Sequence, residues 1–286
     1  MRVLERVITA EANEHPQSEA CVPWWSFSKT VLAAAALVLV SRRRIDLDGP
    51  IAGAPYTLRQ LLQHTSGLPD YGPIPEYHAA VAAREQPWCV DELLRRANAS
   101  TLLFKPGERF AYSNIGYLFV RQLIERVADA NLNTALRALV FDPLGIEGAF
   151  VASTVEEFDR IVWRNARGYD PRWVYHGCVI GSLWWAAVFL HRLMHGELLG
   201  PEPKRAMLEP RPYDADGDPP PGYGLGVMCE DSARGRLAGH AGSGPGSTVV
   251  VFSFLDLTTP RTLAAAVDVD DPDTFPKLIE HLGTLV

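Results

Sequence analysis

The longest uninterrupted apolar stretch of the chain runs from Val31 to Val40. It is well short of the ~20 residues that a membrane helix needs, so we expect a buried core helix and no membrane segment. Ser26 and Lys29 stand just before this stretch, and three arginines at 42–44 follow it. Cations suit the negative end of the helix dipole, which predicts a helix that begins near Ser26 and ends near Arg43.

Between residues 57 and 145 apolar residues recur mostly at helical spacing. The clearest stripe follows Asn114 and consists of Tyr117, Leu118, Val120, Leu123, Ile124 and Val127. Shorter helices are expected at 58–64, after Thr57 as a cap, and near 77–84, 90–98 and 134–141. Polar loops separate these segments, so this part of the chain predicts a helical lobe.

Strand-like segments lie toward the two ends of the chain, at 2–10, 222–228, 247–254 and 262–269. Helices are expected at 183–198 and, capped by Asp273, at 274–285, whereas 146–180 is irregular and 209–223 has the composition of an exposed loop. This order predicts an α+β fold, an antiparallel sheet flanked by helices with an inserted, mostly helical lobe. We expect residues 1–56 and 146–286 to form the sheet domain and 57–145 the lobe, as one composite unit.

Composition excludes several classes of function. Among 286 residues, 47% are hydrophobic and 21% charged, and the net charge of −7 is spread without a basic stripe, so no nucleic-acid partner is expected. The cysteines are scattered, which indicates buried free thiols and neither a metal site nor a disulfide framework. Segment 1–15 lacks the apolar core of a signal peptide, and this predicts a cytoplasmic protein.

Two acidic segments could suggest calcium sites. Asp46 and Asp48 lack the later ligands of an EF-hand loop, and the alternating Asp214, Asp216 and Asp218 are followed by proline where that loop needs glycine. Both are interpreted as solvated turns, and no metal or organic cofactor is expected.

The pair Ser26 and Lys29 suggests nucleophilic chemistry. Residues three apart share one face of a helix, so the hydroxyl and the amine can meet beside the free N–H groups of the helix start. A serine alcohol needs a base, and a lysine can be that base if burial and a neighbouring cation lower its pKa. Alone, Ser-x-x-Lys also occurs by chance in many chains, so the remaining motifs decide the matter.

Two further segments are suggestive only in combination. Tyr112-Ser113-Asn114 precedes a strong helix, where it can present a phenol and an amide to a cleft or simply cap the helix. The glycine-rich segment 239–243 precedes a strand, where a backbone N–H can hold an oxyanion, or it is an ordinary hairpin turn. The chain lacks a Gly-x-Ser-x-Gly elbow, which disfavours an α/β-hydrolase.

Together these motifs resemble one family. SFSKT at 26–30, LLQHTSGLPDY at 61–71, PGERFAYSNIGY at 106–117 and HAG at 240–242 occur in the order seen in class C β-lactamases and their relatives. Those relatives include D-alanyl-D-alanine peptidases, D-aminopeptidases and β-lactamase-like esterases. The resemblance covers about residues 20–254 and implies a site between the sheet and the helical lobe.

The resemblance also implies catalytic roles. Ser26 corresponds to the acylated nucleophile, and Lys29 and Tyr112 would share the proton transfers. It implies that Asn114 contacts the acyl amide of the substrate. These roles require no cofactor.

The remaining implied positions lie in the glycine-rich segment. His240 stands where many β-lactamases have lysine and some peptidases and esterases have histidine. Gly242 and Ser243 belong to the substrate-binding segment, and the backbone N–H groups of Ser26 and Ser243 would form the oxyanion hole.

The chain departs from the family pattern in three places. Only 25 residues precede Ser26, so the sheet is expected to lack strands or to have an open edge. Trp24 and Trp25 stand where small residues are common, and they either narrow the cleft or, as we favour, pack in the core. The short spacing from Tyr112 to His240 predicts trimmed substrate-shaping loops.

The favoured interpretation is a cytoplasmic serine hydrolase that cleaves a small ester or amide through a Ser26 acyl-enzyme. A β-lactamase, a D-alanyl-D-alanine carboxypeptidase or a D-aminopeptidase is the alternative within the family. The alternative from another class is a non-catalytic protein that binds a ligand. The expected partner is a small ester, amide or β-lactam, with oligomeric state open.

Overall fold

The structure is a computed structural model, and it describes residues 3–9, 20–212, 221–232, 235–271, 274 and 277–279. Three expectations fall on other positions. Asp273, most of the helix expected at 274–285, and the acidic loop at 214–218 lie outside the described residues. Within that helix, residues 274 and 277–279 are helical.

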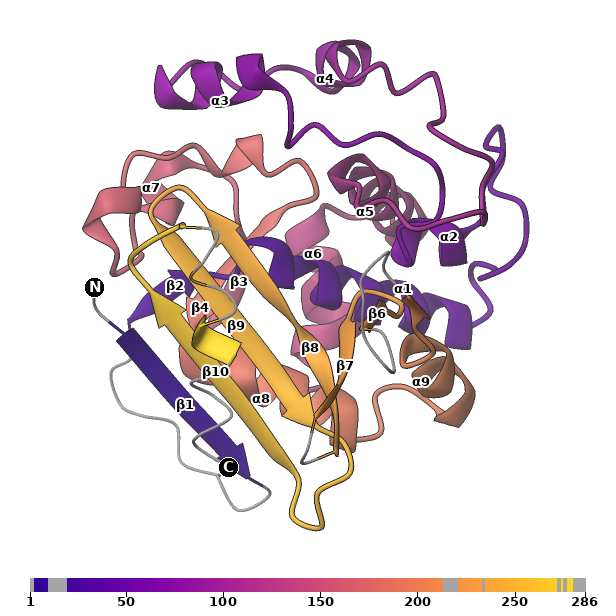
Figure 1. The fold of residues 1–286 in the computed structure, drawn as a ribbon, viewed down its shortest axis with the longest axis vertical. Coiled ribbons are helices and arrows are strands. Elements are labelled where there is room, and N and C mark those ends of the chain that lie inside the picture. The colour runs from indigo at the N-terminus through magenta and orange to yellow at the C-terminus, as the bar shows by residue number, and fades with distance from the viewer. Residues whose placement is uncertain are drawn as a thin grey trace.

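The strands form two antiparallel sheets (Figure 1). The larger has the order β1 (Val3–Thr9), β10 (Arg261–Val267), β9 (Ser247–Phe254), β8 (Gly235–Gly244), β7 (Met228–Ser232), β6 (Gly222–Tyr223) and β5 (Arg211–Pro212). The smaller has the order β2 (Cys21–Pro23), β4 (Cys178–Ser182) and β3 (Ala149–Ala152). The N-terminal strand thus pairs with the last described strand, as the α+β prediction requires, and β1 has an open outer edge among the described residues.

The α-helices are α1 (Ser28–Ser41), α2 (Leu58–Leu62), α3 (Pro75–Ala82), α4 (Val90–Arg96), α5 (Asn114–Ala128), α6 (Leu132–Leu136), α7 (Val155–Phe158), α8 (Leu183–His195) and α9 (Pro201–Met207). Short 3₁₀ turns are η1 (Trp25–Phe27), η3 (Arg164–Ala166) and η4 (Pro171–Trp173), and η2 (Arg137–Phe141) is a π-turn. In the part of the chain that is described, none of the helices is both long and apolar enough to cross a membrane.

Caps explain where the main helices begin. The Thr57 side chain and Gln60 form a reciprocal capping box at α2. Ser113 Oγ accepts from the N–H of Gly116 at α5, and Ser182 does the same for Trp185 at α8. These caps place the helix starts within a few residues of the expected positions.

Helix α1 crosses the centre of the molecule and is buried on all sides from Ser28 to Leu39. It contacts α5 and α6 on the side of the helical lobe and β8 on the side of the larger sheet. Helix α8 covers one face of that sheet, against β1, β9 and β10 (Figure 1). The start of α1 therefore lies where the helical lobe meets the larger sheet.

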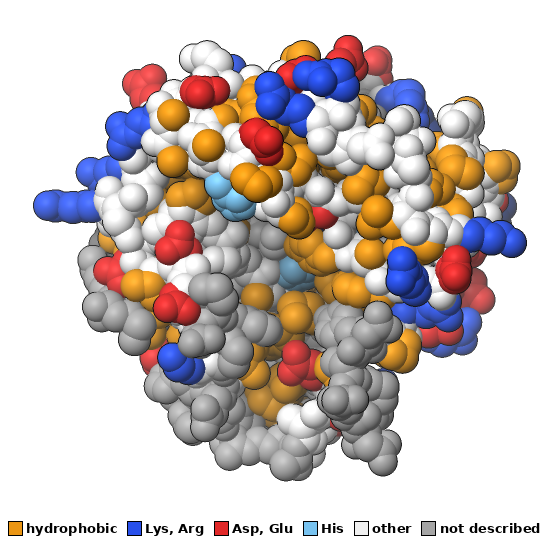
Figure 2. Space-filling model, turned by 45° about the horizontal axis from the view of Figure 1, so that its top comes forward, with side chains coloured by type: hydrophobic (Ala, Val, Ile, Leu, Met, Phe, Trp, Pro, Cys, Tyr) orange, Lys and Arg blue, Asp and Glu red, His pale blue; other side chains and the backbone are white. Residues whose placement is uncertain are grey.

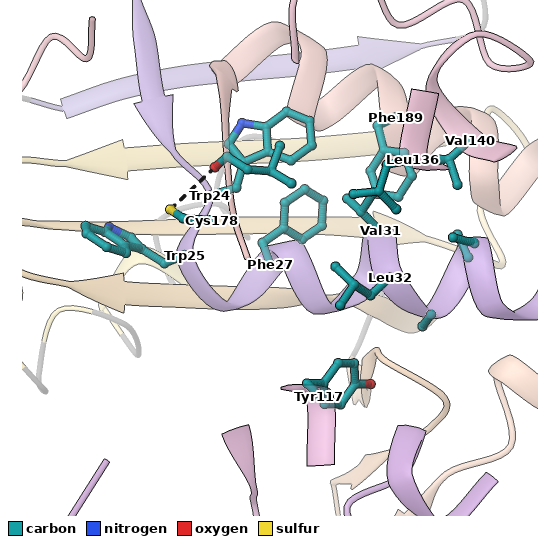
Figure 3. Packing of buried hydrophobic residues seen from close by; sticks show 14 of the residues in the cluster. Trp24, Trp25, Phe27, Val31, Leu32, Tyr117, Leu136, Val140, Cys178 and Phe189 are labelled. Atoms are coloured by element: carbon teal, nitrogen blue, oxygen red, sulfur yellow. Dashed lines mark hydrogen bonds between the residues drawn. The ribbon is translucent and has the colours of Figure 1, made fainter. Parts of the chain in front are cut away.

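Trp24 and Phe27 pack against Phe189 of α8, with ring centroids 6.1 and 5.7 Å away. Figure 3 shows these rings together, with Trp25 pointing away from them. Trp24 is fully buried, and its Nε1 has no hydrogen-bond partner within the described residues. Packing, the favoured interpretation of the two tryptophans, is correct for Trp24.

The expectation of one continuous strand at 222–228 is wrong. The chain forms β6, leaves the sheet, and returns as β7 at Met228. Gly226 has a φ of +79° and lies so close to α1 that an added Cβ would come within 2.3 Å of Ala33 Cβ. Thr30 Oγ1 donates to the Gly226 carbonyl at 2.7 Å, so this contact with α1 replaces strand pairing there.

The interpretation of 239–243 as a turn is also wrong. These residues belong to β8, which pairs with β9 as far as Gly244, and the turn follows at 245–246. Glycine has a weak strand preference, but the backbone ladder to β9 satisfies its polar groups and outweighs that preference.

Segment 146–180, which was expected to be irregular, contains strand β3 and the first part of strand β4. These strands and their partner β2 are too short for an alternating pattern to reveal their pairing. Helix α9 was likewise not expected. It begins directly after Gly200 with Pro201 in its first turn, which is a recognisable start signal.

The aromatic contacts of Trp24 generate a stability prediction. Trp24→Ala should lower the free energy of unfolding by about 3–5 kcal/mol, because a buried ring and its neighbours' contacts are lost. Urea denaturation followed by circular dichroism measures the change. As a control, Leu103→Ala should change stability by less than about 0.5 kcal/mol, because Leu103 is 56% exposed. Equal losses in the two variants would contradict the assigned core.

Candidate active site

Ser26 lies in the η1 turn, and Lys29 lies one turn later at the start of α1. Lys29 Nζ is 3.1 Å from Ser26 Oγ and donates to Asn114 Oδ1 at 2.7 Å. The two side chains therefore meet, as their spacing of three predicts.

The Lys29 ammonium is completely buried, and burial lowers its pKa from 10.5 to about 7. The carboxylate of Asp70 acts in the opposite direction and raises it. Burial is therefore the cause that lowers the pKa of Lys29, and the neighbouring cation expected from the sequence is not needed. Near pH 8 most Lys29 side chains are neutral, and a neutral amine beside a hydroxyl is a base for it.

Tyr112 and Asn114 approach Lys29 from the start of α5. Lys29 Nζ lies 4.9 Å from the centre of the Tyr112 ring. The Asn114 backbone N–H and Nδ2 donate to the two Asp70 carboxylate oxygens, at 2.8 and 3.2 Å. Asp70 thereby orients the amide so that its oxygen faces Lys29, a role for which the sequence contained no separate signal.

Gly242 lets β8 lie directly against the turn that carries Ser26. A Cβ on Gly242 would be 2.5 Å from the Trp24 carbonyl oxygen and 2.8 Å from the Ser26 backbone nitrogen. Strand β7 pairs with β8 only as far as Gly239, so the following residues of β8 are free to face η1 on that edge. The backbones of Ser26 and the Gly242–Ser243 segment are thereby brought together.

His240 belongs to the same strand, β8, and its side chain is buried. Its Nε2 is 2.7 Å from the Tyr223 hydroxyl, and its Nδ1 lies against the Ala241 carbonyl oxygen. Burial, and secondarily the charge of Lys29, lower its pKa to about 3, so the imidazole is neutral at physiological pH. His240 is not part of the cleft wall, and its contact with a substrate stays a prediction.

Two more histidines lie near Lys29, and neither was assigned a role from the sequence, although His64 belongs to the motif at 61–71. His176 Nε2 lies 3.4 Å from Lys29 Nζ. His64 accepts the Ser113 N–H at Nδ1, and its ring centre is 4.2 Å from that of Tyr112. Burial is the main cause that lowers the pKa of both imidazoles well below 6.5. The sequence around His176 contains no motif that signals this proximity.

A cleft of about 210 Å³ opens beside Ser26, with Asn114, His176 and Ser243 among its polar lining residues. Much of the remaining wall is apolar: Trp25, Tyr71, Tyr77, Val81, Tyr169 and Val174. Figure 2 shows a hollow on this face with hydrophobic side chains and a histidine at its wall. Trp25 therefore also narrows the cleft, while its Nε1 donates to Ser247 Oγ at 2.9 Å.

The hydroxyl groups of two tyrosines that line this cleft are bonded to the backbone. Tyr71 and Tyr77 both donate to the Trp173 carbonyl oxygen, at 3.4 and 3.2 Å. Their rings rather than their hydroxyls thus define the cleft wall. Among the described residues, histidine, cysteine and acidic side chains form no group of three or more that could hold a metal ion.

The chain is similar to known proteins in sequence and in fold. The sequence model of the family described as Beta-lactamase matches residues 5–267. A D-aminopeptidase of Brucella canis is 27% identical over 271 residues, an alignment that covers 82% of this chain and 50% of that protein. The chain thus spans about half the length of the curated relatives it matches.

Solved structures share the fold. A D-stereospecific amidohydrolase from a Streptomyces species superimposes with a TM-score of 0.79 at 22% identity, covering 94% of this chain and 89% of that chain. A D-amino acid amidase from Ochrobactrum anthropi SV3 gives a TM-score of 0.76 at 21% identity, covering 93% and 88%. At these identities the likeness concerns the fold.

The burial of Lys29 generates a pH prediction. The rate at which a fluorophosphonate modifies Ser26 should rise with pH through about 7 and level off above it, because only the neutral amine accepts the hydroxyl proton. Asp70→Asn removes the charge that raises the pKa of Lys29, so this rise should move to lower pH. A rise that stays in place in the Asp70→Asn variant would show that Lys29 does not control the reaction.

The contact at Gly242 generates a second prediction. Gly242→Ala should destabilise the protein by about 1–3 kcal/mol and slow the modification of Ser26, because the added methyl overlaps two backbone atoms of the turn. The matched control is Gly116→Ala in α5, where a Cβ meets only ordinary contacts, the nearest at 3.7 Å. Thermal unfolding and labelling rates measure both. A tolerated Gly242→Ala would mean that β8 does not press on the turn.

Proposed function

We propose that this chain, which belongs to the Beta-lactamase family, is a serine hydrolase that opens an amide or ester bond through an acyl-enzyme on Ser26. The observation that carries this proposal is the 3.1 Å contact between Ser26 Oγ and the buried Lys29 amine at the wall of a cleft. The proposal is also supported by the match to the family model and by the fold that the chain shares with amide hydrolases.

The reaction follows from the groups present. Neutral Lys29 takes the hydroxyl proton of Ser26 while Oγ bonds to the carbonyl carbon and the C=O electron pair moves onto oxygen. We assign the backbone N–H groups of Ser26 and Ser243 to this oxyanion. As the bond to the leaving nitrogen or oxygen breaks, the proton passes to that atom from Lys29 through Tyr112.

Deacylation repeats the sequence with water. The Lys29 and Tyr112 pair takes a proton from water, the hydroxide oxygen bonds to the acyl carbon, and Ser26 leaves with the proton. We assign the remaining N–H of Asn114, whose amide Asp70 holds, to the acyl amide of the substrate.

We propose a small amide of a D-amino acid with an apolar side chain as the substrate class. The cleft volume of about 210 Å³ and its wall of aromatic rings suit one side chain of phenyl size. The similar proteins carry the names D-aminopeptidase, D-stereospecific amidohydrolase and D-amino acid amidase. Esters of the same acids would form the same acyl-enzyme, in keeping with the esterase expectation.

A neutral His240 bears on the β-lactam alternative. Penicillins carry a carboxylate. His240 is uncharged and lies outside the cleft wall, so this position offers no cation to that carboxylate, whereas a lysine would. We therefore place β-lactams below amides and neutral esters as substrates.

Ser26→Ala should abolish hydrolysis of D-phenylalanine amide and of p-nitrophenyl butyrate, because the nucleophile is removed. Product release and intact mass after fluorophosphonate treatment measure this. The matched control is Ser28→Ala, which should still carry the label on Ser26 because the Ser28 hydroxyl accepts the Val179 N–H and does not meet Lys29.

The same experiment separates the competing functions. Faster hydrolysis of the D than of the L amide supports the D-amino acid substrate class, whereas ester hydrolysis without amide hydrolysis favours an esterase. An intact chain with no adduct on Ser26 from a fluorophosphonate or a penicillin would favour a non-catalytic binding protein.

A further inference from the structure

Three histidines from three separate parts of the chain surround the Lys29 amine. His64, His176 and His240 are only 1, 2 and 3% exposed. Lys29 lowers the pKa of each imidazole, in addition to the larger effect of burial, so all three are neutral at physiological pH. Of the three, His176 has the ring nitrogen that lies within reach of Nζ, and it also lines the cleft.

The geometry around Nζ matches what a neutral amine needs. Such an amine has two N–H bonds and one lone pair besides its bond to carbon. Asn114 Oδ1 at 2.7 Å and His176 Nε2 at 3.4 Å supply two acceptors, and Ser26 Oγ is a third neighbour at 3.1 Å. If both acceptors are used, the lone pair faces the Ser26 hydroxyl.

We propose that His176 is a positioning residue for Lys29, accepting one of its N–H bonds at Nε2 and thereby directing the lone pair at Ser26. This inference rests on the proposed function, in which Lys29 is the base. It adds a residue to the machinery that none of the four sequence motifs includes.

The backbone around His176 supports a fixed position. Gly177, with a φ of +96°, turns the chain from His176 into β4. The Trp24 N–H donates to the Val179 carbonyl oxygen at 2.8 Å, and the Val179 N–H donates to Ser28 Oγ at 3.0 Å. The strand that follows His176 is therefore bonded on both sides of Ser26, so the imidazole and the amine share one rigid frame.

The proposal specifies the tautomer of His176. If Nε2 accepts, the ring proton is on Nδ1, which is buried without a hydrogen-bond partner among the described residues. The Trp25 backbone raises the pKa of this imidazole, against the larger effect of burial. The alternative Nε2–H tautomer would donate to the Lys29 lone pair and block the base.

Other polar groups near Lys29 are bonded to different partners. His64 accepts from the Ser113 N–H at Nδ1, while its Nε2 is buried without a hydrogen-bond partner among the described residues. His240 meets the Tyr223 hydroxyl, and Asp70 accepts from Asn114. The ring centroids of Tyr112 and Tyr117 lie 4.9 and 5.7 Å from Nζ.

Charged neighbours also keep His176 neutral. Besides Lys29, the Arg121 guanidinium disfavours the charged imidazole and so lowers its pKa, while Arg121 itself donates to the Tyr175 carbonyl oxygen at 3.1 Å. Among the polar groups around the amine, His176 is thus the imidazole whose ring nitrogen faces the base itself.

The test compares His176→Gln with His176→Met, two unbranched side chains of similar volume. Glutamine keeps a strong acceptor near the position of Nε2, whereas methionine fills the space with only a weak thioether acceptor. Both side chains exclude water from Lys29 to a similar degree. The readout is the rate at which a fluorophosphonate modifies Ser26, measured from pH 5 to 10.

In the methionine variant the plateau rate should fall about tenfold to a hundredfold, because the base is misoriented. In the methionine variant the increase of the labelling rate with pH should also occur about one pH unit lower than in the glutamine variant. The reason is that the Lys29 ammonium is less stable without the acceptor, which lowers the pKa of the amine. Glutamine should restore the rate to within about fivefold of the unchanged chain. Equal rates and equal pH dependence in the two variants would overturn the proposal. A lower rate in the methionine variant with no shift in the pH at which the rate increases would also overturn it.

Two spectroscopic measurements separate this inference from the proposed function. Lysine labelled with ¹³C at Cε reports the pKa of Lys29 directly, because the chain contains four lysines and Lys29→Met identifies its signal. The pKa of Lys29 should be lower in the His176→Met variant than in the His176→Gln variant even if Ser26 never reacts. If the fluorophosphonate does not modify Ser26 in the unchanged chain, the proposed function is refuted. The comparison of the Lys29 pKa between the two variants still tests the role of His176 in that case.

The second measurement needs no variant. Long-range ¹H–¹⁵N spectra of the unchanged protein should show His176 as the Nδ1–H tautomer. Finding the Nε2–H tautomer would refute the proposed hydrogen bond whatever the variants do.

Discussion

The burial of the Lys29 amine is the constraint on which the rest of the site depends. Burying a charged ammonium in this position costs free energy, so burial favours the neutral amine. Asn114 and His176 supply acceptors for its N–H groups. Asp70 moderates this effect, because its carboxylate keeps the pKa of the amine from falling further. The result is an amine that changes protonation close to physiological pH.

Holding that amine beside Ser26 requires three structural units to converge on one turn. The smaller sheet bonds to the chain on both sides of Ser26, through Trp24 and Ser28. Strand β8 presses against the same turn at Gly242, and α5 delivers Asn114. Each contact crosses a long sequence separation, so the site forms only when the whole fold forms.

The cleft adds a second layer of specification. Its rings are immobilised by hydrogen bonds from tyrosine hydroxyls to the Trp173 carbonyl oxygen and by the Trp25 bond to Ser247. A rigid apolar wall beside a nucleophile favours substrates with a compact apolar group next to the reacting bond. Trp25 thus belongs both to the core and to the substrate side, whereas its neighbour Trp24 belongs to the core alone.

The sequence by itself determined the α+β architecture, the main helices and the pairing of Ser26 with Lys29, because helix periodicity, caps and a spacing of three are local properties. It did not determine that 239–243 forms part of β8, because the partner strand β9 outweighs the local preference of glycine. Nor did it reveal Asp70 or His176 as neighbours of the amine. Proximity across such sequence separations, and the pKa values that follow from burial, arise only when tertiary packing removes water and brings these side chains together.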